Sequence, residues 1–399
     1  MKKIISVMLA FVMAFAMLAN AFASDVDVSR PEKAHISFNE DGKLTILQVA
    51  DIQDNITLSN FTKRSIINAV EQSQPDLIVM TGDNIAGYLC GTKTLARTSL
   101  KEVMDIFEDI GIPVAMVFGN HDDDNTPYTK LEQIEQYETY DCFIGCAGVV
   151  AEKTVGKNTV TNAGTYNIPI YESAESDKVA YNIWCIDSGN YNPDDSIGGY
   201  GYVFPEQIDW YVEKSNELKE ANGGEPVPSI AFQHIVPPQV FSVLKEVDKG
   251  TEGAVEHGGK YYVLPDDTDK AANWLGETPC PPSTDFEPGY AELNAMLEQG
   301  DVNAVFFGHD HINCYVVNYQ GIDLVSSPGC TFQSYNDANR GFRVITLDKE
   351  NPDSYETYTM RTSDLLEGGS FLDRVMLAVK NFFDGIVNFF KDTFLALFD

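Results

Sequence analysis

The chain has 399 residues, 44% of them hydrophobic and 22% charged, so it is long enough to bury a large core and is not disordered throughout. Acidic residues outnumber basic ones 60 to 27, and the formal net charge of -33 repels nucleic acids and anionic lipid surfaces. A basic groove that holds a nucleic-acid polymer is therefore not expected.

The first 23 residues have the pattern of a secretory signal peptide. Met1-Lys2-Lys3 precedes an apolar run over residues 4–19, and Ala21-Phe22-Ala23 stands before Ser24 as a cleavage site. The alternative is an uncleaved membrane anchor, but a bilayer span needs about 20 apolar residues, which is more than this run supplies. We therefore expect a secreted or extracytoplasmic protein that begins at Ser24.

Five short apolar runs each end at polar residues that can bind a metal ion. Runs of this length, bounded by glycine or turns, predict buried strands, and helical stretches at about 58–72 and 94–109 predict βαβ units with a mostly parallel core. Ligands gather beyond the carboxyl ends of such strands, so we expect the five motifs to converge on one edge. The runs are residues 44–50 before Asp51, 76–80 before Asp83, 114–118 before Asn120, 230–233 before His234, and 302–308 before His309 and His311.

Histidine usage and glycine placement support this interpretation. Four of the six histidines in the chain fall at these strand ends, whereas His35 and His257 are expected to be ordinary core or surface residues. A glycine precedes Asp83, Asn120 and His309, and we expect it to permit the sharp turn that aims each side chain into a shared pocket.

The residue types predict a centre with two metal ions. Carboxylate and amide oxygens mixed with imidazoles suit Mn, Fe, Zn or Co, and six ligands are more than one tetrahedral site needs. A pair of divalent ions that share a carboxylate carries out displacement at phosphorus with a metal-bound hydroxide, and no side-chain nucleophile is required. His121 is then placed to protonate the leaving oxygen, and Asp122 to orient His121 or stabilise its charge. The candidate ligands are Asp51, Asp83, Asn120, His234, His309 and His311.

These blocks resemble, in order and spacing, the five motifs of the calcineurin-like metallophosphoesterases, over about residues 43–347. The stretches 234–238 and 311–313 further resemble the branch related to purple acid phosphatases. The resemblance implies an α/β fold, a four-layer αββα sandwich. It also implies that Asp83 bridges two ions, that Asp51 and His311 hold the first, and that the second lies at Asn120, His234 and His309. His121 is implied as a catalytic residue that is not a ligand. The blocks are Asp51, Gly82-Asp83-Asn84, Gly119-Asn120-His121-Asp122, His234 and Gly308-His309-Asp310-His311.

The chain departs from the family pattern at two positions. The first motif is usually Asp-x-His, but here it reads Asp51-Ile52-Gln53. Gln53 either ligates through its carbonyl oxygen, holds a water or stands clear of the metal, and we expect weaker or differently selective binding there because an amide oxygen is a poorer donor. Ala86 stands where purple acid phosphatases carry a tyrosinate, so the protein is not expected to be purple.

The expected organisation is a signal peptide (1–23), a phosphoesterase domain (24–350), a linker (351–369) and an appended C-terminal amphipathic helix (370–399). Apolar residues recur every three or four positions along this last segment. Two interpretations stay open for it: it packs on the body or on a second copy, or it lies in a membrane or cell-envelope interface.

The long segments between the motifs are expected to carry substrate recognition, and the one after His234 to form a cap or rim. Tyrosines at 191, 200 and 202 either stack on a nucleoside or sugar or build a small core, and Arg340 is a candidate phosphate contact. Seven cysteines are an odd number for an exported protein, and we expect no disulfide.

The sequence therefore predicts a secreted, metal-dependent phosphoesterase that acts on a small phosphate ester, with phosphomonoesterase activity favoured. A phosphodiesterase or nucleotidase of the same fold is the alternative within this class. From a different class, a non-catalytic cell-envelope binding protein with a degenerate site fits the substitution at Gln53.

Overall fold

The computed structural model describes residues 35–269, 271–368 and 374, all within the unit formed by residues 33–399. The expected signal peptide lies outside these residues, and so does the expected C-terminal helix apart from Arg374. Within the described ranges, no helix is long and apolar enough to cross a membrane.

The first sheet has five strands in the order β16-β15-β1-β2-β3. Three of them are parallel, as expected: β1 (Lys43–Val49), β2 (Leu77–Thr81) and β3 (Val114–Val117). The crossover helices α2 (Asn60–Ser73) and α3 (Lys93–Ile110) begin where Ser59 and Thr92 accept a backbone N–H of the first turn. Two antiparallel strands, β15 (Gly341–Asp348) and β16 (Tyr355–Arg361), complete the sheet beside β1.

The second sheet has eight strands in the order β11-β13-β14-β12-β7-β6-β5-β4. Its centre, β14-β12-β7-β6, is parallel, and the strands on either side are antiparallel. The strands are β4 (Val149–Val155), β5 (Asn158–Tyr171), β6 (Val179–Cys185), β7 (Ser229–Phe232), β11 (Trp274–Leu275), β12 (Val302–Phe307), β13 (Asn313–Tyr319) and β14 (Ile322–Ser326).

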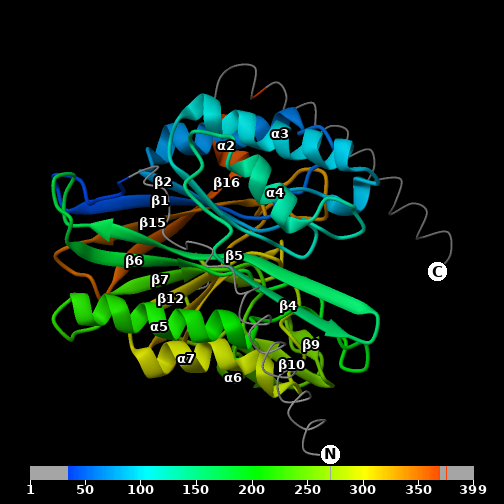
Figure 1. Cartoon of the computed structure of the whole chain (residues 1–399). Coiled ribbons are helices and arrows are strands. Elements are labelled where there is room, and N and C mark those ends of the chain that lie inside the picture. The colour runs from blue at the N-terminus through cyan, green and yellow to red at the C-terminus, as the bar shows by residue number, and fades with distance from the viewer. Residues whose placement is uncertain (1–34, 270, 369–373, 375–399) are drawn as a thin grey trace, which may run out of the picture. The chain divides into compact units, whose positions relative to one another are not determined.

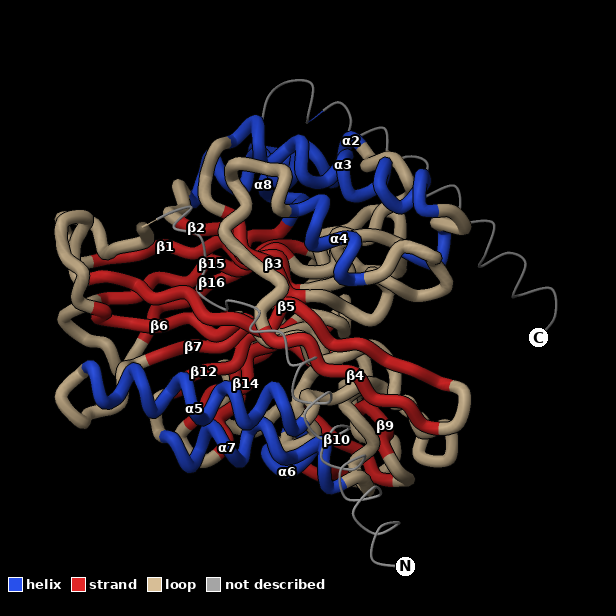
Figure 2. The backbone as a smooth tube through the Cα atoms, viewed as in Figure 1, coloured by secondary structure: helices blue, strands red, loops and turns tan. Residues whose placement is uncertain are grey.

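The two sheets lie face to face, and helices cover the outer face of each (Figures 1 and 2). On the first sheet these are α2, α3, α4 (Lys130–Tyr137) and α8 (Thr362–Gly368), and on the second α5 (Pro205–Ala221) and α7 (Ala291–Gln299). The apolar layer between the sheets includes Ile46, Val79, Ile183 and Phe306, all fully buried. The fold is thus the four-layer αββα sandwich that the family resemblance implies.

Shorter elements lie in the long connections. Residues after β7 form a separate three-stranded sheet, in the order β8-β10-β9. None of the seven cysteines, all of which fall in the described ranges, takes part in a disulfide. The remaining elements are η1 (Gly87–Leu89), α6 (Val240–Val243), β8 (Lys245–Val247), β9 (Val255–His257), β10 (Lys260–Val263) and η2 (Glu287–Tyr290).

Within the segment expected to be a linker, residues 355–368 form a strand and a helix of the folded body. Strand β16 pairs with β15 over seven residues, from Tyr355 opposite Leu347 to Arg361 opposite Gly341. Helix α8 follows directly, and the side-chain amide of Asn68 in α2 donates to the carbonyl of Leu365 at 3.1 Å. From Tyr355 to Thr359 the residues of β16 alternate between half-buried and exposed, as those of an edge strand do.

Candidate functional site

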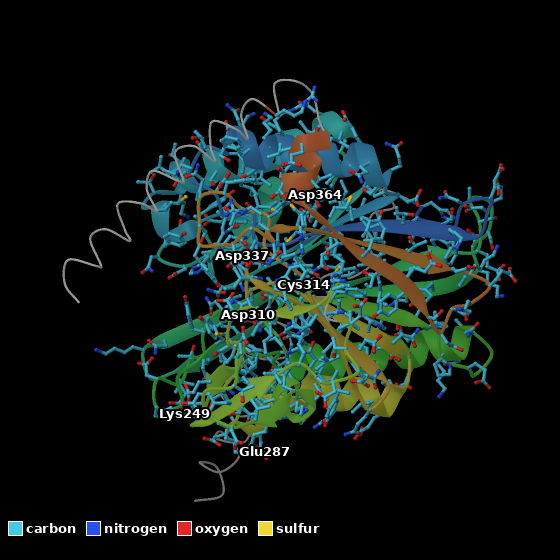
Figure 3. All side chains as sticks on the ribbon, turned by 180° about the vertical axis from the view of Figure 1, so that it is seen from behind. Lys249, Glu287, Asp310, Cys314, Asp337 and Asp364 are labelled. Carbon is cyan, nitrogen blue, oxygen red and sulfur yellow. The ribbon has the colours of Figure 1, made fainter. Side chains whose placement is uncertain are left out.

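The candidate ligands meet at the carboxyl ends of parallel strands from both sheets. Asp51, Asp83 and Asn120 follow β1, β2 and β3 of the first sheet, whereas His234 and the pair His309 and His311 follow β7 and β12 of the second. All six side chains lie in buried positions. Asp310, between the last two histidines, marks this region in Figure 3, where it lies between the two helical layers. The expected convergence therefore occurs across the inter-sheet layer and not along one sheet.

The backbone at three candidate ligands has a conformation that non-glycine residues seldom adopt. The φ angles of Asp51, Asp83 and His309 are 53°, 50° and 73°, and these are three of the six positive values at non-glycine positions among the described residues. Such strain of about 1–3 kcal/mol per residue persists where the surroundings enforce it, which is a common feature of functional sites.

The glycines next to the ligands meet our expectation at one position and differ from it at two. Gly82, before Asp83, has a positive φ angle of 84°. Neither Gly119 nor Gly308 has a positive φ angle. A Cβ atom on Gly119 would lie 2.2 Å from Oδ1 of Asp83, and one on Gly308 would lie 2.6 Å from Oδ2 of Asp51. Gly119 and Gly308 therefore leave room for a neighbouring carboxylate, and the positive φ angles lie at Gly82 and at the ligand residues Asp83 and His309.

One group of donor atoms surrounds Nε2 of His234. This atom lies 3.1 Å from Oδ1 of Asn120, 3.2 Å from Nδ1 of His309 and 3.4 Å from Oδ2 of Asp83. On the other side of the ring, Nδ1 donates to the carbonyl of Thr81 at 2.9 Å, which leaves the Nε2 lone pair directed at the group in the neutral histidine.

A second group joins Asp51, Asp83 and His311. Nε2 of His311 lies 3.5 Å from Oδ1 of Asp51 and 2.6 Å from Nε2 of Gln53, while Nδ1 donates to the carbonyl of Tyr335 at 2.7 Å. Asp83 belongs to both groups, and in each the potential ligand atoms lie within 4.8 Å of one another. This division is the one that the family resemblance implies.

Burial and neighbouring charges shift the pKa values of the candidate ligands. Burial raises the pKa of Asp51 well above its usual 3.8, and it lowers the pKa of His311 to about 4. Burial also opposes charge on His234, yet the adjacent carboxylate of Asp83 raises the pKa of this ring to about 9. The position at Nε2 of His234 thus favours a positive charge, whether a proton or a cation supplies it.

The donor set fits a pair of divalent ions. Carboxylate oxygens, an amide oxygen and imidazole nitrogens converge with lone pairs facing one another, and buried acceptors in such an arrangement are stabilised by a cation. Two buried atoms of the site, Oε1 of Gln53 and Nε2 of His309, have no hydrogen-bond partner within the described residues. Asp83 belongs to both groups, so it is the residue that would contact both ions.

His121 lies beside the two groups and is 30% exposed at its side chain. Its backbone N–H donates to Oδ1 of Asp83 at 2.8 Å, and Nδ1 of its ring lies 3.3 Å from Oδ2 of Asp124. Asp124, which the sequence interpretation missed, thus orients His121 and leaves Nε2 available to a ligand. The run of three aspartates after His121 was the signal for such a partner, but not for which of them makes the contact.

Asp122, which we expected to orient His121 or stabilise its charge, bonds to backbone groups of two loops. Its buried carboxylate accepts the backbone N–H groups of Gly119 at 2.7 Å and Ile85 at 3.0 Å, and so joins the loops after β2 and β3. Burial and the nearby charge of Asp83 raise the pKa of Asp122 to about 7. Its contribution is to hold the two loops that carry Asp83 and Asn120.

Aromatic side chains border the site. The ring of Tyr335 stacks on His311 with centroids 4.1 Å apart, and the ring of Tyr200 meets His309 edge-on at 4.2 Å. Of the other expected aromatic contacts, Tyr191 reaches Asn120, whereas Tyr202 is buried in a small core with Phe204. No pattern in the sequence pointed to Tyr335, which lies in an irregular loop after β14.

Two further expectations concerned the segments around the site. Arg340 lies over the ring of Phe332, 4.4 Å from its centroid, and its Nε donates to the carbonyl of Asp337. From the segment after His234, Glu277 accepts the backbone N–H of Ile312 at 3.0 Å and the hydroxyl of Tyr335 at 3.3 Å. Residues near Glu277 therefore form part of the rim.

Comparison with known proteins relates the chain to phosphoesterases. The family model described as calcineurin-like phosphoesterase matches residues 44–313. The chain is 24% identical to "Probable inactive purple acid phosphatase 29" of Arabidopsis thaliana, over 79% of this chain and 80% of that one. It is 25% identical to "Probable inactive purple acid phosphatase 14" of the same plant, over 87% and 84% of the two chains. A solved dimetal phosphatase from Danio rerio is 12% identical with a TM-score of 0.45, and covers 79% of this chain and 98% of its own.

The family match spans every candidate ligand, from Asp51 to His311, together with His121. It also spans both halves of the sandwich, from β1 of the first sheet to the beginning of β13 in the second. Since residues 44–313 are more than half of the chain, the protein belongs to the calcineurin-like phosphoesterase family.

Proposed function

We propose that this protein is a metal-dependent hydrolase of phosphate esters that prefers phosphomonoesters. The observation that carries the proposal is the pair of ligand groups that share Asp83, with His121 beside them but in neither group. Asp51, Asp83 and His311, with Asn120, His234 and His309, would hold two divalent ions. When bound, such a pair supplies Lewis acidity toward the phosphoryl oxygens and an acidified water for the attack.

The residues of the chain itself supply position and a proton. Asp124 fixes the ring of His121 through Nδ1, so that a proton held at Nε2 can pass to the leaving oxygen. Asp122 holds the backbone of both ligand loops, and Gly119 and Gly308 let the carboxylates of Asp83 and Asp51 approach closely. Mutual positioning of this kind is a large part of catalysis at phosphorus.

The preference for monoesters follows from charge. Two divalent ions against the carboxylates of Asp51 and Asp83 leave a net charge of about +2, which matches a dianionic monoester better than a monoanionic diester. The test compares hydrolysis of p-nitrophenyl phosphate and bis-p-nitrophenyl phosphate by metal-loaded wild-type protein and by His121→Ala. Activity on neither ester in the wild type would refute the proposal, and a faster rate on the diester would favour the phosphodiesterase or nucleotidase alternative.

A second candidate function rests on Gln53 and on the names of the relatives. Two curated relatives carry the words "probable inactive", and Gln53 stands where the family usually has a ligand histidine. A non-catalytic binding protein of the cell envelope would fit both observations. Metal analysis separates the two functions. A reconstituted protein with fewer than ~0.2 metal ions per chain would support the binding protein, because the ligands of a metal-dependent hydrolase should bind metal ions under these conditions.

We further propose that the protein is exported and does not bind nucleic-acid polymers. The pattern of residues 1–23 and the net charge of -33 support this. Cell-envelope contact through residues 370–399 is part of the same proposal. N-terminal sequencing of the mature protein should begin at Ser24, and deletion of residues 370–399 should release surface-associated protein. An intact Met1 or an unchanged distribution would contradict the respective statement.

A further inference from the structure

Exposed aromatic side chains gather at the candidate site. Nine large hydrophobic side chains in the described residues are exposed, and three of them, Tyr88, Tyr191 and Tyr335, contact site residues. Single exposed hydrophobic residues need no explanation, but a group of them around one polar site is typical of a ligand-binding surface. We call these three residues together with Tyr200 the tyrosine rim.

Two members of the tyrosine rim lie on one loop between β6 and α5. Tyr191 and Tyr200 form an isolated antiparallel bridge, and their rings stack with centroids 5.8 Å apart and an interplanar angle of 24°. The hydroxyl of Tyr191 accepts from Nδ2 of Asn120 at 3.4 Å, while Tyr200 meets the ring of His309. This side of the rim therefore borders the group centred on His234.

The same loop is tied to the residues around His121. The side-chain amide of Asn190 donates to Oδ1 of Asp123 at 3.1 Å, and the backbone N–H of Gly189 donates to Asp187 at 2.9 Å. Asp187 in turn pairs with Lys130, and both side chains are almost fully buried, at 0% and 1% exposed. The two stacked rings are thus anchored to the segment that carries the proposed proton donor.

The other side of the tyrosine rim comes from η1 and from the loop after β14. The ring of Tyr88 meets the ring of His121 edge-on, with centroids 4.9 Å apart and an interplanar angle of 70°. The side chain of Ser334, which precedes Tyr335, lies near the hydroxyl of Tyr88. Rings of the tyrosine rim therefore contact both His121 and Asn120, where the leaving group of a bound ester would lie.

Packing on the histidines does not by itself explain the rim. Tyr88, Tyr191 and Tyr335 remain 41%, 39% and 54% exposed, so much of each ring is open to solvent beside a polar site. Exposed aromatic faces of this kind bind planar π-systems by stacking. The strength of stacking depends little on which base or substituent the planar group carries.

From this arrangement we infer that the tyrosine rim is a binding site for a flat aromatic group on the alcohol part of the substrate. The inference rests on the proposed function, because it places the phosphate at the two ligand groups. The shared chemistry is a planar ring near the ester oxygen, and it has two sources: the base of a nucleotide or the aryl group of an aryl-alkyl phosphate.

The experiment compares esters whose leaving alcohols are alike. Adenosine 5′-monophosphate and ribose 5-phosphate both release a primary ribose hydroxyl and differ in the base. Benzyl phosphate and cyclohexylmethyl phosphate are similar in size and differ in the flat ring. We expect a kcat/KM ratio of about tenfold or more for at least one pair, as stacking on one or two rings provides. The pair that shows the ratio identifies the source of the ring.

Variants separate stacking from other effects. Tyr88→Leu and Tyr191→Leu should each lower the ratio at least about threefold, whereas Tyr191→Phe keeps the ring and should hold it within about twofold. The matched control is Tyr358→Leu, since Tyr358 is 52% exposed on edge strand β16 and lies opposite Val344. It should leave the ratio as in the wild type.

Two results would overturn the inference: ratios below about threefold for both pairs in the wild type, or equal ratios in the wild type and both leucine variants. If no ester is hydrolysed, the proposed function fails, and the same pairs are compared as dissociation constants by calorimetry on the Mn²⁺-loaded protein. A tenfold preference in binding would then support the tyrosine rim, and its absence would refute it.

Discussion

Nε2 of Gln53 lies 2.6 Å from Nε2 of His311, and this contact determines how the first ligand group can work. Nδ1 of His311 donates to Tyr335, so Nε2 has the lone pair that would bind a metal ion. In this orientation the amide of Gln53 donates to that lone pair, and its own Oε1 is buried without a partner among the described residues. Rotation of the Gln53 amide by 180° would exchange its NH2 group and its oxygen. The oxygen would then face His311, where it could bind a cation held by this histidine.

Gln53→His should therefore increase metal binding at the first group. An imidazole nitrogen is a better metal ligand for Mn, Fe, Zn or Co than an amide oxygen, and one ring nitrogen of a neutral histidine has a lone pair in place of an N–H. We expect a lower dissociation constant for the more weakly bound of two ions, by about tenfold or more, measured by titration calorimetry together with metal analysis.

The control for this substitution is Asn55→His. Asn55 is exposed on the same loop and bonds to Gln333, so the variant adds a histidine close to the site but outside both ligand groups. Asn55→His should leave the number of metal ions bound per chain unchanged. A Gln53→His protein that binds no more metal than the wild type would show that Gln53 does not limit the first group.

Asp124 and Asp122 should respond in opposite ways to the same substitution. Asp124→Asn removes the carboxylate that orients His121, so kcat should fall by about tenfold and the pH dependence of kcat should change, with little loss of stability. Asp122→Asn leaves one of two buried backbone N–H groups without an acceptor and should lower the free energy of unfolding by about 1–3 kcal/mol.

The measurements are pH–rate profiles and urea denaturation of both variants. His121→Asn sets the scale, because loss of a proton donor reduces rates by about 10²–10⁴-fold. If Asp122→Asn altered the pH profile while Asp124→Asn did not, the role assigned from the sequence would be right, and the contact between Asp124 and His121 would not control the proton donor.

The strand ends were predictable because two physical rules act together at them. Buried parallel strands are short apolar runs, and metal ligands are polar residues of few types, so an apolar run that ends at Asp83 or His234 carries both signals. The family motifs added the division of ligands between two groups. Strand β16 was missed because the polar residues of an exposed edge strand resemble those of a linker.

Contacts made by irregular loops were not predictable in the same way. Tyr335 reaches His311, and Asp124 rather than Asp122 reaches His121, only because of loop conformations that no periodic pattern encodes. The glycines illustrate a further limit. A glycine in a sequence indicates either an unusual φ angle or a close approach, and at Gly119 the three-dimensional neighbour Asp83 decides between them.

Lys130 should be essential for stability because its partner is buried with it. Nζ donates to both oxygens of Asp187, at 3.0 and 2.8 Å, and the pair anchors the loop that carries Tyr191. Lys130→Met leaves a buried carboxylate unpaired and should lower the free energy of unfolding by about 3–5 kcal/mol. Urea denaturation measures the change.

Lys178→Met provides the surface counterpart. Lys178 pairs with Glu172, but the two side chains are 65% and 38% exposed, so its loss should change stability little. Equal effects of the two substitutions would mean that water reaches the Lys130–Asp187 pair and that burial does not set its strength.

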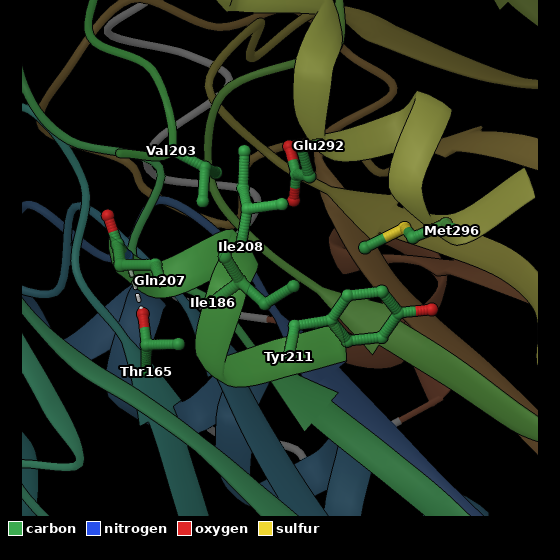
Figure 4. Close-up of a pocket in the computed structure, with 8 residues that line it drawn as sticks. All are labelled: Thr165, Ile186, Val203, Gln207, Ile208, Tyr211, Glu292 and Met296. Carbon is green, nitrogen blue, oxygen red and sulfur yellow. Dashed lines mark hydrogen bonds between the residues drawn. The ribbon is translucent and has the colours of Figure 1, made fainter. Parts of the chain in front are cut away.

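A small cavity under the second sheet contains a carboxylic acid that no part of the proposed mechanism uses. The cavity has a volume of about 10 Å³, and Glu292 of α7 lines it together with Gln207, Tyr211 and Met296 (Figure 4). Oε1 of Glu292 is buried and has no hydrogen-bond partner within the described residues. Burial raises the pKa of Glu292 from its usual 4.5 to about 8.

Glu292 should therefore make the protein less stable as the pH rises. The folded state holds this proton more tightly than the unfolded state, so the stabilisation is fully present below about pH 4.5 and is lost as the pH rises through about 8. The slope is at most about 1.4 kcal/mol per pH unit. Glu292→Gln should remove that slope and be more stable than the wild type at pH 8, as measured by urea denaturation at pH 5, 6.5 and 8. Glu298→Gln, an exposed position on the same helix, should keep the wild-type slope. A Glu292→Gln protein that loses stability with pH as steeply as the wild type would show that the carboxylate is ionised in the folded state throughout this range.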